Sequence, residues 1–285
     1  MAVSRAAPAK INLYLHVLGR HADGFHLLDS LVVFADIADR VSAREAEALS
    51  LEIAGPYAPA LQAERDANLV LRAARLLAER AGIAPKAALV LEKNLPVASG
   101  IGGGSSDAAA ALSALAELWR LGPSALRIDD LATALGADVP VCLFGKSAWV
   151  GGIGEAVTAA PPFPPGWIVL ANPGVALATA EVFRVRTGPF SQPARFTVAP
   201  VGLKELAALL GERRNDLTQA AITLAPAIAQ VLDALKREKD AMLARMSGSG
   251  ATCFALFGDE ASARAAASRI AAQHRGWWVA SGRLL

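Results

Sequence analysis

Apolar and polar residues alternate near the start of the chain, and this period of two predicts a β-strand over residues 9–18. One face of the strand would be apolar and buried. The other would be polar, with Lys10 and Asn12 pointing the same way. A turn at 19–24 and a second apolar run at 31–37 follow, so the sequence predicts a second strand directly after the first.

Helical and strand-like patterns then mix along the chain without a regular alternation. Residues 68–82 have apolar residues at helical spacing and end at Gly82, a residue that suits a helix C-terminus. An alanine-rich helix is predicted at about 106–119. The other predicted elements are strands at 49–53, 88–92, 167–171 and 276–280, a strand–glycine turn–strand unit at 241–257, and helices at 129–135, 179–185, 203–210, 216–224, 226–239 and 261–273. This mixture predicts an α+β fold.

A proline-rich segment at 159–166 cannot continue a regular element, so we interpret it as a domain junction. The chain has 285 residues, which suits two modest domains. We therefore expect an amino-terminal domain at 1–158 and a carboxy-terminal domain at 159–285.

Composition narrows the classes of protein to consider. Hydrophobic residues make up 54% and charged residues 19%, which excludes a disordered chain. The net charge is +2 without a run of five like charges, so nucleic acid is not an expected partner. No apolar stretch is long enough to span a membrane, and no signal peptide precedes the first strand, so we expect a cytoplasmic protein. The two cysteines lie in apolar stretches and the four histidines have no zinc spacing.

A glycine-rich segment at 96–106 joins a predicted strand to a predicted helix. Glycines let the backbone approach a phosphate closely, and a helix N-terminus presents free N–H groups and the positive end of its dipole. The segment lacks the lysine of a Walker loop after Gly104, and Ser105 stands where a dinucleotide fingerprint needs glycine. The alternative is a flexible connector in which Ser105 only caps the helix.

The full pattern Pro-x-Ala-Ser-Gly-Ile-Gly-Gly-Gly-Ser-Ser-Asp resembles the second signature of the GHMP kinases, with Ile101 in place of the usual leucine. Residues 8–13 resemble the first signature of that family and 247–253 the third, although the third alone could be an ordinary hairpin turn. The resemblance implies a two-domain fold, with an amino-terminal ribosomal-S5-like domain and a carboxy-terminal ferredoxin-like α/β sandwich. It also implies ATP and Mg²⁺ as cofactors. The implied ATP-binding residues are Pro96, Val97, Ala98, Ser99, Gly100, Ile101, Gly102, Gly103, Gly104, Ser105, Ser106, Gly248 and Ser249.

Four further segments, 22–26, 136–140, 172–175 and 215–217, resemble one branch of the family. That branch phosphorylates a cytidine diphosphate-linked methylerythritol, and the resemblance implies a cytosine ring held between aromatic faces. The implied substrate-binding residues are Asn12, Phe25, His26, Thr179 and Phe183. Phe25 stands where the branch has tyrosine, so a hydroxyl is missing. From the residues alone, His26 could be a solvated turn residue, Phe183 a core residue, and Asn215 and Asp216 a helix cap.

Transfer of a phosphoryl group to an alcohol needs help with the alcohol proton and with the developing negative charge. Asp138 is the candidate base, in what we predict is an extended turn before Pro140. Lys10 is the candidate group for the charge. Ser105 or Ser106 could reach the metal, and Asp107 is expected to favour the helix dipole; the sequence does not identify the metal ligands. Rival interpretations are a homoserine or mevalonate-type kinase and a non-catalytic RNA-binding protein. A monomer or weak homodimer is expected.

Overall fold

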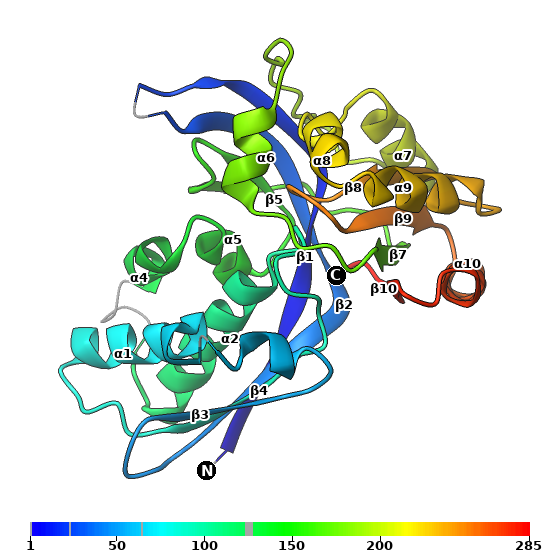
Figure 1. Ribbon diagram of the computed structural model, residues 1–285. Helices are drawn as coiled ribbons and strands as arrows, with labels where there is room; N and C mark the ends of the chain where they lie inside the picture. The colour runs from blue at the N-terminus through cyan, green and yellow to red at the C-terminus, as the bar shows by residue number, and fades with distance from the viewer. Residues whose placement is uncertain (1, 23, 64, 123–127) are drawn as a thin grey trace. The chain divides into compact units, whose positions relative to one another are not determined.

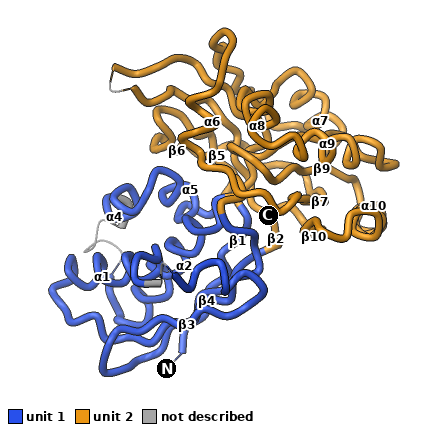
Figure 2. The backbone as a smooth tube through the Cα atoms, in the orientation of Figure 1, with its two compact units in different colours: residues 1–9, 38–97, 102–145 blue, residues 10–37, 98–101, 146–285 orange. Residues whose placement is uncertain are grey.

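The computed structural model describes residues 2–22, 24–63, 65–122 and 128–285 (Figure 1). Of the predicted motifs, only Asp23 within 22–26 lies outside the described residues. The chain forms two compact units (Figure 2). Unit 1 comprises residues 1–9, 38–97 and 102–145, and unit 2 comprises residues 10–37, 98–101 and 146–285. Both long amino-terminal strands and the glycine-rich segment therefore contribute residues to each unit.

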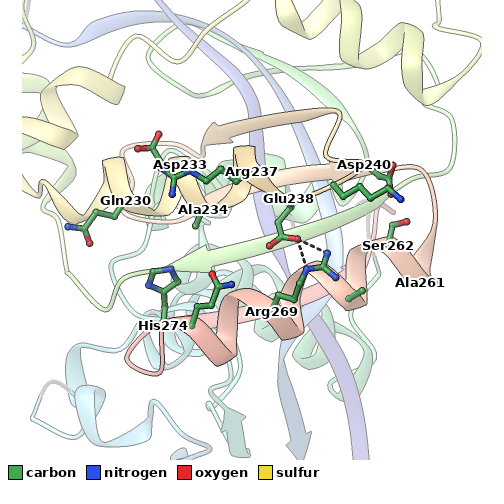
Figure 3. A pocket seen from close by; sticks show the side chains of 13 residues that line it. Gln230, Asp233, Ala234, Arg237, Glu238, Asp240, Ala261, Ser262, Arg269 and His274 are labelled. Carbon is green, nitrogen blue, oxygen red and sulfur yellow. Dashed lines mark hydrogen bonds and ion pairs between the residues drawn. The ribbon is translucent and has the colours of Figure 1, made fainter.

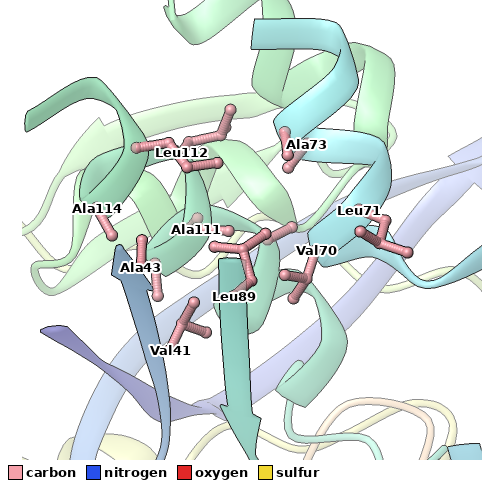
Figure 4. Close-up of a cluster of buried hydrophobic side chains, with 14 of the residues drawn as sticks. Val41, Ala43, Val70, Leu71, Ala73, Leu89, Ala111, Leu112 and Ala114 are labelled. Carbon is pink, nitrogen blue, oxygen red and sulfur yellow. The ribbon is translucent and has the colours of Figure 1, made fainter. Parts of the chain in front are cut away.

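Unit 1 is built on a small sheet. Strand β3 (Ser50–Ala54) pairs in parallel with β4 (Ala88–Glu92), and β4 pairs antiparallel with the second half of β2 (His26–Arg44). Helices α1 (Leu69–Ala81) and α2 (Gly103–Leu118) pack against each other. The alanines of α2 and the apolar side chains of the strands close the core, as Figure 4 shows for Val41, Leu89 and Leu112.

The helices of unit 1 begin and end where local chemistry favours it. The Asn68 side chain accepts a 2.9 Å hydrogen bond from the Val70 N–H and caps α1, and Gly82 ends that helix in the left-handed conformation. Two 3-10 turns, η1 (Ala58–Leu61) and η2 (Arg65–Ala67), precede α1, and α4 (Ile128–Leu135) and α5 (Val139–Phe144) complete the unit. Every helix that the sequence predicted in this unit is present.

Helix α5 corrects one prediction. The sequence suggested an extended turn at 138–140, but Asp138 has helical backbone angles and is the N-cap residue of α5. Pro140 lies in the first turn of this helix, where the N–H that proline lacks would have no helical partner in any case. The candidate base therefore stands at the start of a short helix.

Unit 2 contains a four-stranded antiparallel sheet in the order β10 (Trp278–Arg283), β7 (Trp167–Asn172), β9 (Cys253–Phe257) and β8 (Leu243–Met246). Its core includes Val169, Phe257 and Ile270, all fully buried. Helices α9 (Ala227–Arg237) and α10 (Glu260–Gln273) contact these strands, and α6 (Thr179–Val185), α7 (Leu203–Gly211) and α8 (Thr218–Leu224) complete the helical part.

A second group of strands in unit 2 was not predicted. The first half of β2 pairs antiparallel with β5 (Ala148–Gly151), and β5 pairs antiparallel with β6 (Ala156–Ala159). Strands β5 and β6 have four residues each, which is too few for a periodic pattern to identify them. No helix among the described residues is long and apolar enough to cross a membrane.

Strand β1 (Ala2–Arg20) has the predicted alternation, but its polar face is buried as well as its apolar face. Lys10 and Asn12 are each only 4% exposed, and Tyr14 is fully buried. The Tyr14 hydroxyl donates a 2.8 Å hydrogen bond to Asp29, and the same carboxylate accepts 2.8 Å hydrogen bonds from Arg195 and from the Ala194 N–H. Buried polar side chains need hydrogen-bond partners, and Tyr14 finds its partner in Asp29.

Arg245 ties β8 to the rest of unit 2 through backbone carbonyls. Its guanidinium donates hydrogen bonds to the carbonyl oxygens of Leu13 at 2.7 Å, Leu210 at 2.8 Å and Arg213 at 2.5 Å. Burial, and to a lesser extent the charge of Arg213, lowers the pKa of Arg245 to about 10. The side chain therefore keeps its charge at neutral pH, and the three carbonyl dipoles stabilise that charge.

Candidate functional site

The centre of the glycine-rich segment contacts the glycine turn between β8 and β9, both within unit 2. Ser247 donates a 3.1 Å hydrogen bond from its hydroxyl to the Gly100 carbonyl, and the Thr252 N–H donates a 3.1 Å bond to the Ser99 carbonyl. Gly100 has a φ of +74°, and a Cβ there would lie 2.6 Å from the Gly250 carbonyl oxygen. Only glycine fits this close approach of two backbones.

Strand β1 joins the same place. The Lys10 N–H donates a 2.9 Å hydrogen bond to the Ile101 carbonyl, and the Asn12 N–H donates a 3.1 Å bond to the Ser247 hydroxyl. Ser247 therefore accepts from β1 and donates to Gly100 at once. The structure thus brings together parts of all three predicted signatures, which lie up to 237 residues apart in the sequence as numbered from Lys10 to Ser247.

Asn215 binds the glycine turn between β8 and β9 through its side chain. Its side-chain amide donates hydrogen bonds of 2.9 Å to the Met246 carbonyl and 2.8 Å to the Gly248 carbonyl, and its oxygen accepts from the Leu217 N–H at 2.9 Å. The N-cap residue of α8 is Leu217, without a side-chain bond of its own, so Asn215 lies two residues before it. Of the predicted capping role, the bond from the Leu217 N–H to the Asn215 side chain is present. An asparagine before a helix looks the same in sequence whether it caps that helix or binds a distant turn.

The predicted substrate residues of unit 2 take part in two contacts, one of them with the predicted ATP-binding residue Ser249. The hydroxyls of Thr179 and Ser249 lie 2.9 Å apart, and the rings of His26 and Phe183 stack with centroids 4.9 Å apart. Phe25 is 59% exposed. The structure therefore stacks two of these rings on one another and leaves Phe25 at the surface, so no ring-sized gap separates His26 from Phe183.

The electrostatic surroundings keep the His26 ring neutral. Burial lowers the pKa of His26 below its usual 6.5, and the positive charges of Arg20 and Arg186 lower it further. A neutral imidazole has one donor and one acceptor nitrogen. It can therefore exchange both kinds of hydrogen bond with the edge of a heterocyclic base.

In unit 1, α2 begins at Gly103, directly after Gly102 in the left-handed conformation. Ser106 lies in the first turns of this helix, and its hydroxyl donates a 2.7 Å hydrogen bond to the Pro8 carbonyl. Ser106 is only 2% exposed, whereas Ser105 beside it is half-buried. Of the two serines predicted to reach a metal, Ser105 is therefore the more accessible.

A buried charge cluster near this helix was not predicted. Lys93 forms ion pairs with Asp39 and, at 2.8 Å, with Asp107, and all three side chains are at most 3% exposed. Burial disfavours the Lys93 ammonium, but the two carboxylates outweigh this effect and raise the pKa of Lys93. Asp39 also accepts a 2.8 Å hydrogen bond from the N–H of Leu95, the residue directly before the glycine-rich segment. Asp107 therefore does more than favour the helix dipole.

The two candidate catalytic residues belong to different units. Asp138 is half-buried in unit 1 at the start of α5, and Lys10 is buried in unit 2. Pro96 and Val97 belong to unit 1, whereas residues 98–101 belong to unit 2. Their assigned roles therefore rest on the sequence motifs and on the surroundings of each residue in its own unit.

A separate groove of about 1000 Å³ lies between α9 and α10 in unit 2 (Figure 3). Acidic and basic side chains line it together, and Arg269 bonds to Glu238 across it at 2.6 Å. None of the predicted site residues lines this groove. Within the described ranges there is also no group of three or more histidine, cysteine, aspartate or glutamate side chains that could hold a metal ion.

Known protein families match most of this chain. The model of the GHMP kinases N terminal domain matches residues 68–146, and that of the GHMP kinases C terminal domain matches residues 201–276. Two curated relatives, from Paramagnetospirillum magneticum and Cereibacter sphaeroides, are both named 4-diphosphocytidyl-2-C-methyl-D-erythritol kinase. The first is 53% identical over 98% of this chain and 97% of its own length. The second is 55% identical over 98% of each chain.

Solved structures agree with these matches. A crystal structure of 4-(cytidine 5'-diphospho)-2C-methyl-D-erythritol kinase superimposes with a TM-score of 0.78 and 34% identity, covering 99% of this chain and 98% of that one. A homoserine kinase from Cytophaga hutchinsonii superimposes with a TM-score of 0.69 at 18% identity, covering 99% and 94%. The second likeness supports the fold alone. The expected α+β, two-domain fold is confirmed.

Proposed function

The chain belongs to the GHMP kinase family, and we propose that it transfers the γ-phosphoryl group of ATP to the 2-hydroxyl of 4-diphosphocytidyl-2-C-methyl-D-erythritol. This reaction is a step in the non-mevalonate synthesis of isoprenoid precursors. The observation that carries the choice of substrate is the full-length identity of 53% and 55% to kinases named for it. Four expectations stay predictions. They are the domain boundary between residues 158 and 159, the cytoplasmic location, the absence of nucleic acid as a partner, and a monomeric or weakly dimeric state.

The nucleotide phosphates are proposed to bind the glycine-rich segment 96–106 together with Gly248 and Ser249. Two observations support this. The start of α2 presents free N–H groups and a positive dipole, which attract anions. Gly100 and Gly248 approach so closely that a Cβ at Gly248 would lie 2.6 Å from the Gly100 carbonyl. The absence of side chains at both positions lets the glycine turn pack directly on the glycine-rich segment, so these two proposed phosphate-binding stretches lie together.

Asp138 is proposed to accept the proton of the reacting hydroxyl, and Lys10 to stabilise the negative charge that develops on the oxygens. Lys10 is 4% exposed on the polar face of β1, and its backbone N–H is bound to Ile101 of the glycine-rich segment. Its position is therefore fixed relative to residues 98–101 of that segment. Asp138 is fixed at the start of a short helix, which limits the directions in which its carboxylate can point.

The cytidine part of the substrate is proposed to bind His26 and Phe183, with Phe25 as a second aromatic face. Thr179 and Asn12 would contact polar groups of the substrate. The stacked rings and the low pKa of His26 support this role. Since His26 and Phe183 already stack on one another, the base would bind alongside this pair rather than between them.

Mg²⁺ is proposed as the second cofactor, and it would neutralise charge on the β- and γ-phosphates. The residues fit an ion that arrives with ATP. Mg²⁺ often takes one or two protein groups, with the remaining ligands from phosphates and water. Near the start of α2, the Ser105 side chain is half-buried, and the buried Asp107 Oδ1 atom has no hydrogen-bond partner among the described residues.

The test is a comparative kinase assay with this substrate, homoserine and mevalonate, using wild type, Lys10→Ala and Asp138→Ala. Wild type should phosphorylate the cytidine-linked alcohol with strong preference, and each variant should lose at least about a hundredfold in turnover. Thermal unfolding of each variant shows whether the protein stays folded. Near-normal turnover in Asp138→Ala would refute the base assignment, and preference for homoserine or mevalonate would refute the substrate.

A further inference from the structure

The side-chain amide of Asn12 is held on one side and has no partner on the other. Its nitrogen donates a 2.8 Å hydrogen bond to the Ser30 hydroxyl. The Ser30 hydroxyl in turn donates a 2.6 Å hydrogen bond to the Tyr14 carbonyl. The Asn12 Oδ1 atom is buried and has no hydrogen-bond partner within the described part of the chain.

These bonds determine which way the amide points. A carbonyl oxygen can only accept, so the single proton of the Ser30 hydroxyl is committed to Tyr14. Ser30 can then only accept from Asn12. A flipped amide would place two acceptor oxygens 2.8 Å apart, without a proton between them. The nitrogen of Asn12 therefore faces Ser30, and Oδ1 is the end left available.

The available oxygen faces the candidate site. The Asn12 N–H is bonded to Ser247, and a Cβ at Gly248 would lie 3.4 Å from Oδ1. Asn12 also shares the polar face of β1 with Lys10. A buried acceptor without a donor is destabilising, so such an atom at a binding site indicates a ligand that supplies the proton.

We propose that Ser30 is a positioning residue that fixes Asn12 as a hydrogen-bond acceptor for a hydroxyl group of the alcohol substrate. The inference rests on the proposed function, and it adds the direction of the hydrogen bond and the residue that imposes it. The site would thereby select a substrate with a hydroxyl donor at this point. An analogue with an ether or a hydrogen there could not satisfy Oδ1.

The test compares Ser30→Ala, Ser30→Thr, Asn12→Ala and the double variant Asn12→Ala with Ser30→Ala. Without the Ser30 hydroxyl the amide can rotate, so Ser30→Ala should raise KM for the alcohol by about tenfold and leave KM for ATP unchanged. Threonine keeps the hydroxyl and should restore KM. In the Asn12→Ala background, Ser30→Ala should change KM by less than about twofold.

A matched control is Ser113→Ala, which removes another serine hydroxyl bonded to a backbone carbonyl, that of Ala109 at 2.9 Å. It should leave both KM values unchanged. Equal effects of Ser30→Ala with and without Asn12 would overturn the proposal, because Ser30 would then act only on the fold. A lower kcat with both KM values unchanged would also overturn it, because Oδ1 would then act in the chemical step rather than in substrate binding.

A spectroscopic readout separates this proposal from the proposed function. In the ¹⁵N spectrum of the wild type, the side-chain protons of Asn12 should exchange slowly with water, and Ser30→Ala should abolish that protection. This result does not depend on turnover of any substrate. Fast exchange in the wild type would overturn the positioning role, whereas a wild type inactive on the cytidine-linked alcohol would overturn the function.

Discussion

Replacing Gly100 with alanine tests the close approach between the glycine-rich segment and the β8–β9 turn. The new Cβ would lie 2.6 Å from the Gly250 oxygen and 2.7 Å from the Ser247 oxygen. Both are backbone atoms, so no side-chain rotation can relieve the overlap. The backbone of residue 100 also has a φ of +74°, where alanine is strained.

The expected loss of folding stability in Gly100→Ala has two parts. Left-handed backbone costs alanine about 1–2 kcal/mol, and forcing extra volume into a packed site costs about 1–3 kcal/mol. The sum is about 2–5 kcal/mol. Gly82→Ala is the matched control, because Gly82 has a φ of +66° and a Cβ there would meet no atom within 4 Å. Gly82→Ala should lose only the stability that the left-handed backbone costs. The difference in stability between the two variants therefore measures the cost of the steric overlap at residue 100.

The assay is urea unfolding of both variants, together with the KM for ATP. Gly100→Ala should be about 1–3 kcal/mol less stable than Gly82→Ala, or should bind ATP about 5- to 150-fold more weakly if the segment moves aside instead. Gly82→Ala should bind ATP as the wild type does. If the two variants unfold at the same urea concentration and both bind ATP normally, a Cβ at residue 100 does not overlap the β8–β9 turn.

Two further predictions concern buried charge and pH. Lys93→Met leaves Asp39 and Asp107 buried without their counter-charge and should lower the free energy of unfolding in urea by about 3–5 kcal/mol. The control is Lys86→Met, which removes an exposed pair with Glu47 and should cost under about 1 kcal/mol. Similar losses of stability in the two variants would contradict the burial of the cluster. Because the pKa of His26 is lowered on folding, the unfolded chain binds that proton first, and the stability that His26 contributes should be lost as pH falls below about 6.5. His26→Gln should remove this part of the pH dependence of unfolding, and an unchanged dependence would show that His26 is not perturbed.

Local patterns predicted much of the fold. The alternation in β1 and the helical spacing that ends at Gly82 each report a period that burial imposes on a regular element, and both elements are present. The glycine-rich segment can also be identified from the sequence alone, because close approach of the backbone restricts the residue type to glycine.

Pairings between distant residues could not be predicted in the same way. In the sequence, Lys93 is an ordinary charged residue after a strand. Its partner Asp39 lies 54 positions away in another strand. Asn215 likewise bonds to a turn 33 positions away. The error at Pro140 has a different cause, since proline suits both an extended turn and the first turn of a helix. Only tertiary structure decides between such alternatives.

The buried Arg245 has a consequence for how sequences in this family can diverge. Its partners are the carbonyl oxygens of Leu13, Leu210 and Arg213, which any residue type supplies. The hydrogen bonds of Arg245 therefore place no requirement on the side chains at those three positions, although Leu13 and Leu210 are fully buried for their own part in the core. An aligned set of relatives should retain arginine at 245 with no co-varying partner, because lysine has one ammonium and cannot span three carbonyls as a planar guanidinium does.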